Sequence, residues 1–194
     1  YLDGSAGSLL PTDGAEASWR LDPGRLPFEA LRPDRVFIVG AGAGVEVAHA
    51  LETGASTVHA ADVNAAGVRL AERAWADLGP LDGVDPFTDP RVTWRFDEAR
   101  SVLAATDSQW DLISVAQAVT RTAEARGLAL TENGVYTAEA FANMLTHLVP
   151  DGVLALEMYD EATLTRALFT ASASLQEEGL AGSDAAALDH MIAV

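Results

Sequence analysis

Three glycines at alternating positions, followed by an aspartate, are the residues of this chain whose types and spacing indicate chemistry. Gly40, Gly42 and Gly44 follow the apolar run 36–39, and Asp62 lies twenty-two residues after Gly40, at the end of a second apolar run. Glycine lets the backbone turn sharply and approach a ligand, and a following helix offers free N–H groups at its start. An acid after the second strand is placed to accept hydrogen bonds from ribose hydroxyls. The pattern predicts a site for an adenosine-type cofactor.

Each of these residues also has a purely structural interpretation. Any tight turn between a strand and a helix can use glycine. Asp62 and Asn64 are both suitable residues for the N-cap of the next helix. We prefer the ribose role for Asp62 because one carboxylate can accept hydrogen bonds from both hydroxyls.

Composition excludes several classes of chemistry. The chain has 194 residues and no cysteine, and its twelve basic residues are all arginine. Without cysteine there is no disulfide or thiolate zinc site, and without lysine there is no Schiff base and no Walker lysine. The four histidines have no metal-ligand spacing, so no metal site is predicted. A net charge of −17 disfavours nucleic acid and anionic membranes, and suits a solvated surface or a cationic substrate.

Alternating strand and helix patterns predict one α/β domain over residues 35–194, with a mostly parallel sheet covered by helices on both faces. Residues 1–34 contain many glycines, prolines and aspartates with little periodicity, which predicts an irregular lead-in with at most a short strand or hairpin. Loop 117–136 should lie at the carboxyl ends of the strands, where substrate contacts gather, whereas loop 79–90 leads into a strand and should not. The expected strands are 35–39, 57–62, 91–96, 110–116, 152–158 and 189–194, and the expected helices are 44–53, 64–78, 98–106, 137–148 and 160–178.

The glycine spacing distinguishes two cofactor classes. A dinucleotide site favours G-x-G-x-x-G, but Val45 stands three residues after Gly42, and the third glycine comes earlier. The order of motifs resembles the spermidine synthase family, which has the class I methyltransferase fold, and within it the bacterial relatives fused to membrane-spanning segments. The motifs are VFIVGAGAG at 36–44, VHAADVN at 58–64, DPRV at 89–92, DEARSVL at 97–103, LTENGVYTAEAF at 130–141 and PDG at 150–152.

The resemblance implies a Rossmann-like class I methyltransferase fold, in which the usual seventh strand is not recognisable here. It also implies S-adenosylmethionine or decarboxylated S-adenosylmethionine as cofactor. Glu46 would reach the methionine portion or would simply complement the helix dipole. Asp97 and Glu98 would lie beside adenine, although both also suit a helix start. The expected cofactor-binding residues are Gly40, Gly42, Gly44, Glu46, Asp62, Asp97 and Glu98.

Carboxylates that the family uses for aminopropyl transfer are absent from their positions. That reaction needs a base that keeps the attacking amine neutral. Ala116 stands where the family has an aspartate at the end of the fourth strand, and Ala43 replaces an acid of the glycine loop. No catalytic residue is therefore assigned, and Glu132, Tyr136 and Asp111 are the groups to test.

The predicted function is a transferase domain that moves a group from this cofactor to a small acceptor, for which a cation is suited. The alternatives are a catalytically degenerate nucleotide-binding or interaction domain, and an NAD-binding module. We expect no nucleic acid partner and no membrane contact from this segment, and a homodimer stays open. The expected location is the cytoplasm, or the soluble domain of a membrane-anchored parent.

Overall fold

Strands and helices alternate along the chain in a computed structural model, which describes residues 22–80, 83–116, 134–158, 161–177, 179 and 191–193. The strands are β1 (Arg35–Val39), β2 (Thr57–Ala61), β3 (Val92–Arg95), β4 (Trp110–Ala116), β5 (Leu148–Glu157) and β6 (Met191–Ala193). They form one sheet in the order β3-β2-β1-β4-β5-β6, and every neighbouring pair is parallel. The strand order reverses between β1 and β4, and the crevice outside the carboxyl ends at such a point is where open α/β sheets bind ligands.

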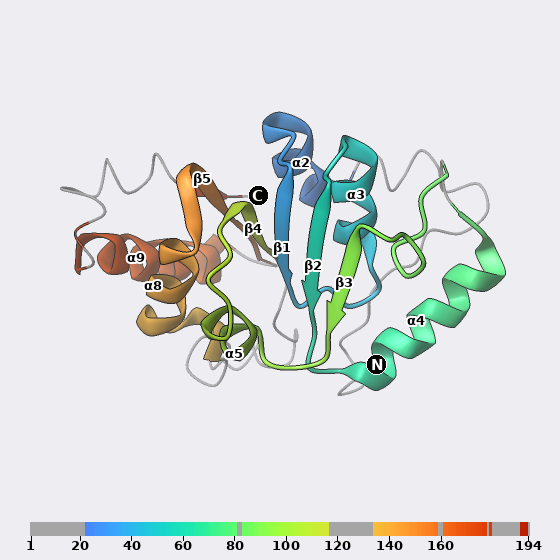
Figure 1. Cartoon of the computed structure of the whole chain (residues 1–194). Coiled ribbons are helices and arrows are strands. Elements are labelled where there is room, and N and C mark those ends of the chain that lie inside the picture. Colours follow the sequence, from blue (N-terminus) through green and yellow to red (C-terminus); the bar gives the residue numbers. More distant parts are fainter. Residues whose placement is uncertain are drawn as a thin grey trace.

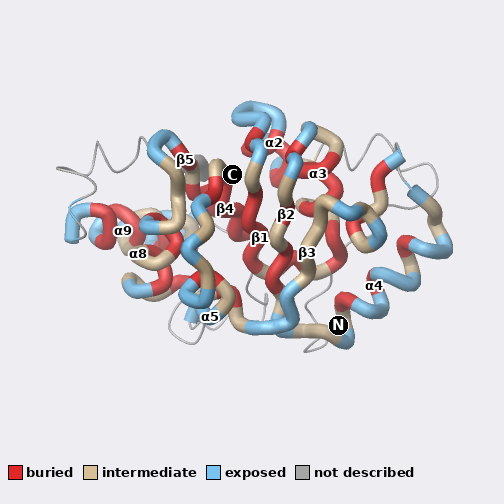
Figure 2. The backbone as a smooth tube through the Cα atoms, in the orientation of Figure 1, coloured by how far each residue is buried: buried red, intermediate tan, exposed pale blue. Residues whose placement is uncertain are grey.

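Helices cover both faces of this sheet, as the sequence predicts (Figure 1). Successive strand residues enter different cores: Phe37 and Val39 pack with α5, α8 and α9, whereas Val36 and Ile38 pack with α2 and α3. Buried residues follow the strands and the sides of the helices that pack on them (Figure 2). The helices are α2 (Leu26–Leu31), α3 (Val45–Thr53), α4 (Ala65–Leu78), α5 (Ala99–Ala104), α8 (Ala138–Thr146) and α9 (Glu161–Glu177), with 3-10 turns η1 (Pro23–Arg25) and η2 (Gly134–Tyr136).

The described part of the lead-in is helical, so the expectation of an irregular segment with at most a strand or hairpin is wrong there. Asp22 accepts a hydrogen bond from the N–H of Gly24 (3.1 Å) and begins η1, and Arg32, at φ 46°, ends α2. Phe28 is fully buried against α3. Residues 22–32 therefore pack into the core that supports the glycine loop.

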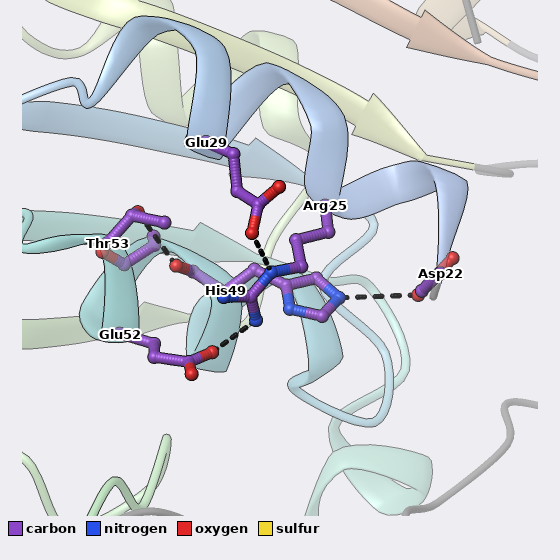
Figure 3. A network of polar contacts seen from close by, with 7 residues as sticks. Asp22, Arg25, Glu29, His49, Glu52 and Thr53 are labelled. Carbon is purple, nitrogen blue, oxygen red and sulfur yellow. Dashed lines mark hydrogen bonds and ion pairs between the residues drawn. The ribbon is translucent and has the colours of Figure 1, made fainter. Parts of the chain in front are cut away.

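A polar network fastens this lead-in to α3 (Figure 3). Arg25 donates to Glu29 (2.7 Å) and to Glu52, and Asp22 Oδ2 lies 3.3 Å from Nε2 of the fully buried His49. The contact with His49 is the main cause that holds the pKa of Asp22 below its usual value. These contacts hold the lead-in, including Asp22, against α3.

Strand β5 begins at Leu148, four residues earlier than the sequence predicts. The pairing of β4 with β5 is irregular here, because Trp110 pairs with Leu148 and Leu112 pairs with Val153. Two residues of β4 therefore lie opposite five of β5, and β5 carries a bulge. Asp151, at φ 67°, lies within it. Within the described ranges, no helix is long and apolar enough to cross a bilayer, and no group of three or more potential metal ligands occurs.

Candidate functional site

The loop between β1 and α3 owes its shape to the alternating glycines. Gly40, Gly42 and Gly44 have φ angles of 73°, 48° and 82°, a region in which other residues are strained. The N–H groups of Gly40 and Ala41 both donate to the carbonyl of Ala61, at 2.9 and 3.2 Å. The loop is therefore tied to the end of β2 and lies at the carboxyl edge of the sheet.

Asp62 fastens the glycine loop. Its Oδ2 accepts from the N–H of Gly42 at 2.8 Å, and its Oδ1 accepts from the N–H of Asn64 at 2.6 Å. The N-cap of α4 is Asn64, whose Oδ1 accepts from the N–H of Gly67 at 3.1 Å. The cap therefore belongs to Asn64. Because a carboxylate oxygen can accept two hydrogen bonds, Asp62 still has room for ribose hydroxyls.

Three residues that the sequence does not assign to the site, Trp75, Pro86 and Phe87, support the loop. The indole N–H of the buried Trp75 on α4 donates to the carbonyl of Ala43 at 2.8 Å. A Cβ built on Gly44 would lie 3.0 Å from Cγ of Pro86 and 3.3 Å from the ring of Phe87. The prediction that loop 79–90 lies away from the site is thus wrong for residues 86 and 87, which lie against Gly44. Trp75 shows in the sequence only as a core aromatic.

The residues expected near adenine, Asp97 and Glu98, follow β3. The N–H of Asp62 donates to the carbonyl of Arg95 (3.0 Å), so the ends of β2 and β3 are joined. Asp97 is exposed, and its Oδ1 accepts from the N–H of Glu98 (2.7 Å). Oε1 of Glu98 is buried without a partner among the described residues. Val63, directly after Asp62, is 71% exposed.

The other end of the loop, toward β5, carries three carboxyl groups: Asp22, Glu46 and Glu157, which we name the acid end. Glu46 lies in the first turn of α3, and burial raises its pKa to about 8, with smaller contributions from the charges of Glu157 and Asp22. A Cβ on Gly24 would lie 2.7 Å from Oε2 of Glu157 and 3.5 Å from Oδ1 of Asp22. Sequence reasoning missed Glu157, whose only signal is its place at the end of a strand.

Of the three groups to test for catalysis, Asp111 lies away from the glycine loop. Asp111 is at the amino end of β4, where its Oδ2 accepts from the N–H groups of Asp34 (3.1 Å) and Arg35 (2.7 Å). Asp111 therefore has a structural role at the end of the sheet opposite the glycine loop. Tyr136 is 2% exposed and packs against Phe141. Glu132 lies outside the described residues.

Alanines occupy the two positions where the resembled family has carboxylates, and the structure shows which residues lie beside them. Ala116 pairs in register with Glu157, so β5 brings a carboxyl group beside the end of β4. Ala43 is 6% exposed and holds Trp75 through its carbonyl. The acids of this site thus stand on β5 and α3 instead of on β4 and the loop.

The strand order, the glycine loop and the acid after β2 define a Rossmann-like fold of the class I methyltransferase type. Neither a family model nor a curated protein sequence matches the chain. Similar solved structures include a spermidine synthase in complex with the transition-state analogue AdoDATO and the spermidine synthase from Thermotoga maritima. Each has a TM-score of 0.55 and 16% identity, over 82% of this chain and 50% of that chain.

A SAM-dependent methyltransferase from Agrobacterium tumefaciens is also similar, with a TM-score of 0.55 and 15% identity, over 83% of this chain and 50% of that one. The chain thus spans about half the length of each of these proteins. At sequence identities this low, the structural similarity shows a shared fold and nothing more. Function has to be argued from the site.

Proposed function

We propose that this domain binds decarboxylated S-adenosylmethionine or S-adenosylmethionine along the carboxyl edge of the sheet and transfers a group from it to a small acceptor. The observation that carries the proposal is the hydrogen bond from Gly42 to Asp62 within a loop of three positive-φ glycines. This loop stands at the point where the strand order reverses. Backbone N–H groups, a carboxylate and a helix start converge there, which is the donor set that an adenosine ligand requires.

The polar groups around the loop suit this cofactor at both of its ends. Toward β3, Asp62 would accept from the ribose hydroxyls, the exposed Val63 offers an apolar surface for a base, and the unpartnered oxygen of Glu98 can accept from an amino group. Toward β5, Glu46 and Glu157 would hold an ammonium group. A Cβ at Gly44 would push against Pro86 and narrow this cradle.

The acid end favours the decarboxylated cofactor. S-adenosylmethionine carries a carboxylate beside its ammonium group, whereas the decarboxylated form carries the ammonium alone. Glu157 and Asp22 would repel that carboxylate and attract the ammonium, which would in turn lower the pKa of Glu46 and favour its ionised form. We therefore expect decarboxylated S-adenosylmethionine to bind more tightly than S-adenosylmethionine.

When bound, this cofactor supplies an electrophilic carbon next to a positively charged sulfur. The residues of the chain would bind and orient it: the glycine loop and Asp62 fix the nucleoside, and Glu46 and Glu157 fix the amine. An acceptor amine has to be neutral at nitrogen to attack. The carboxylate that does this work in the resembled family is replaced by Ala116, so the proposal assigns no base.

A second function is favoured by one specific observation. Ala43 and Ala116 occupy the two positions where an aminopropyltransferase of the resembled family has carboxylates, and both are almost fully buried. A domain that binds the cofactor without transferring its group would look the same. NAD binding is the third alternative, and the glycine spacing disfavours it.

Calorimetric titration can separate these functions. We expect decarboxylated S-adenosylmethionine to bind most tightly, then S-adenosylmethionine and methylthioadenosine, with no binding of NAD. Glu46→Gln should weaken the decarboxylated cofactor about tenfold and leave methylthioadenosine, which lacks the amine, within twofold. Glu72→Gln on the exposed side of α4 is the control for the change in charge. Tighter binding of NAD, or no binding of any adenosine ligand, contradicts the proposal.

A product assay then tests the transfer. The decarboxylated cofactor with putrescine, and S-adenosylmethionine with a panel of small amines, would be followed by mass spectrometry. A new aminopropyl or methyl adduct supports the transferase. Cofactor binding without any adduct supports the non-catalytic alternative.

A further inference from the structure

One face of the sheet changes character over β2 and β3. Side chains on the opposite face, such as Val58 and Trp94, pack into the core with α3. The side chains that alternate with these point to the other face. On that face Thr57, His59 and Thr93 are half-buried, and Arg95 is exposed. In a doubly wound sheet both faces are normally apolar and covered by helices. Here the alternation of apolar and polar residues indicates a sheet that is solvated on one side.

No described helix crosses this polar face. In Figure 1, α8 and α9 lie over the β4–β5 side of the sheet, and α5 lies near the carboxyl ends, so the front of β2 and β3 is free of described helices. Helix α5 has only six residues. It is therefore too short to reach from the carboxyl ends of the strands to their amino ends, which in such a sheet takes a helix of two or three turns.

Three basic side chains share this face, and we name them the cationic sheet face: Arg35, His59 and Arg95. Register pairs Arg35 with Thr57, the residue two before His59, and pairs Arg95 with Ala61, the residue two after it. The guanidinium of Arg35 lies 5.3 Å over the ring of Trp110, and the ring of His59 lies 4.7 Å from the same ring. The three side chains therefore form a diagonal row on one side of the sheet, with a guanidinium group at each end.

The two arginines of the cationic sheet face, Arg35 and Arg95, have no carboxylate partner within 4 Å in the part of the chain that the structure describes. Burial, followed by the charges of Arg95 and Arg35, lowers the pKa of His59, which agrees with both guanidinium groups lying near its ring. In a chain with net charge −17, this is a local concentration of positive charge. At physiological ionic strength charges act over about 8 Å, so a ligand on this face feels the arginines more than the distant acids.

We propose that the cationic sheet face is a docking surface for an acidic helix of a partner protein, which would cover β2 and β3 as a helix of the fold normally does. Along the row, each side chain is displaced from the previous one by one strand sideways and two residues along the strand, which is about 8 Å. The row from Arg35 to Arg95 therefore spans about 16 Å. That is about three turns of helix, whose facing positions are i, i+4, i+7 and i+11. Carboxylates at the ends of such a row would pair with Arg35 and Arg95, and one between them could accept a hydrogen bond from the neutral imidazole of His59.

The charges argue against a second copy of this chain in a symmetric, face-to-face arrangement. A two-fold axis would place the same surface on both subunits. Arg35 and Arg95 of one copy would then meet the same cations of the other. An acidic helix meets the opposite condition, because it neutralises two guanidinium groups that otherwise have no described counter-charge.

Fluorescence anisotropy with a defined probe tests the proposal. The probe is a labelled alanine-based helical peptide with glutamate at i, i+4, i+7 and i+11, and its twin has glutamine there. The paired substitution Arg35→Gln and Arg95→Gln is compared with Arg69→Gln and Arg73→Gln, which removes the same charge from exposed positions of α4. We expect at least tenfold weaker binding of the glutamate peptide to the first variant, less than twofold change for the second, and no binding of the glutamine peptide.

Each other result would overturn the proposal. Equal losses in both variants would show a non-specific charge effect, and equal binding of both peptides would exclude carboxylate recognition. Tighter binding of oligothymidylate, lost in the Arg35 and Arg95 variant, would indicate nucleic acid instead. Sedimentation that shows a dimer dissociated by the same variant would assign the face to a second copy. No binding of the glutamate peptide would also refute it, with circular dichroism showing that each variant is folded.

Discussion

Asp62 shapes its surroundings before any ligand arrives. One oxygen holds the N–H of Gly42 and the other holds the N–H of Asn64, so the carboxylate sets both the loop before it and the turn after it. A carboxylate bound to two backbone donors has a fixed orientation. The cost of orienting it is therefore met during folding, and a ribose would find its acceptor in place.

Glu46 should make the stability of the protein depend on pH. Its pKa is about 8 in the folded state against an ordinary 4.5, so the folded protein keeps a proton that the unfolded chain loses. The free energy of unfolding should therefore fall as the pH rises from 4.5 to 8. Glu46→Gln removes this loss and should be more stable than the parent by on the order of 2 kcal/mol above pH 8, which is about 4–8 °C in Tm. Near pH 4.5 the two proteins should melt together.

A matched variant, Glu139→Gln, should change the stability of the protein in the opposite direction as the pH rises. Glu139 occupies the first turn of α8 as Glu46 does that of α3, but it is exposed. Backbone and Thr137 hydrogen bonds lower the pKa of Glu139. Glu139→Gln should therefore lose stability above pH 5 rather than gain it. Thermal melts of all three proteins between pH 4 and 9 make the test, and a Tm difference for Glu46→Gln that does not vary with pH would refute the raised pKa.

At the scale of elements, alternating patterns predict most of the fold because strands and helices differ in the period of their apolar residues. Strands β1 and β4 have the predicted bounds. Helix α2 was missed because its six residues are too few to show a period and it begins beside Pro27. The start of β5 was missed because Pro150, Asp151 and Gly152 suggest a turn, and a bulge in a strand uses the same residues.

The candidate site is predictable where a local motif marks its residues, as the glycine spacing and the acid after the second strand do. Gly40, Gly42 and Gly44 show their role through local spacing, since their positive φ angles require glycine. Glu157 and Pro86 reach the same loop from distant parts of the chain, through pairings that no local pattern encodes. Contacts of this kind depend on the assembled sheet.

Gly44 offers a test of how tightly this loop is packed. Gly44→Ala would place a Cβ at φ 82° and 3.0 Å from Pro86. Gly54→Ala at the other end of α3, at φ 104° with nothing within 4 Å, carries the backbone strain alone. In urea unfolding we expect a loss of about 1 kcal/mol for Gly54→Ala and about 2–3 kcal/mol for Gly44→Ala, because the second adds a steric contact. Equal losses would show that Pro86 moves aside freely.

Charge is distributed unevenly over the whole molecule. The chain has 29 acidic residues and 12 arginines. Some arginines pair within the fold: Arg25 bridges α2 and α3 through Glu29 and Glu52, and Arg91 pairs with Asp89. Arg35 and Arg95 are left on the cationic sheet face. The excess of acids therefore has few partners inside the molecule, and repulsion among them opposes the compact state.

Salt should therefore stabilise this protein. Raising NaCl from 20 to 300 mM shortens the screening length from about 20 Å to about 6 Å, so repulsion among the surface acids weakens. The attractive pairs lose less, because Arg25 and Glu52 are mostly buried and hold each other at contact. We expect Tm to rise by several degrees, and to rise similarly with KCl, while sucrose of equal osmolality has a smaller effect. The paired substitution Arg35→Gln and Arg95→Gln makes the net charge −19 and should steepen the rise. A Tm that falls with salt would mean that the ion pairs at α3 dominate the electrostatic free energy, with the surface acids contributing little.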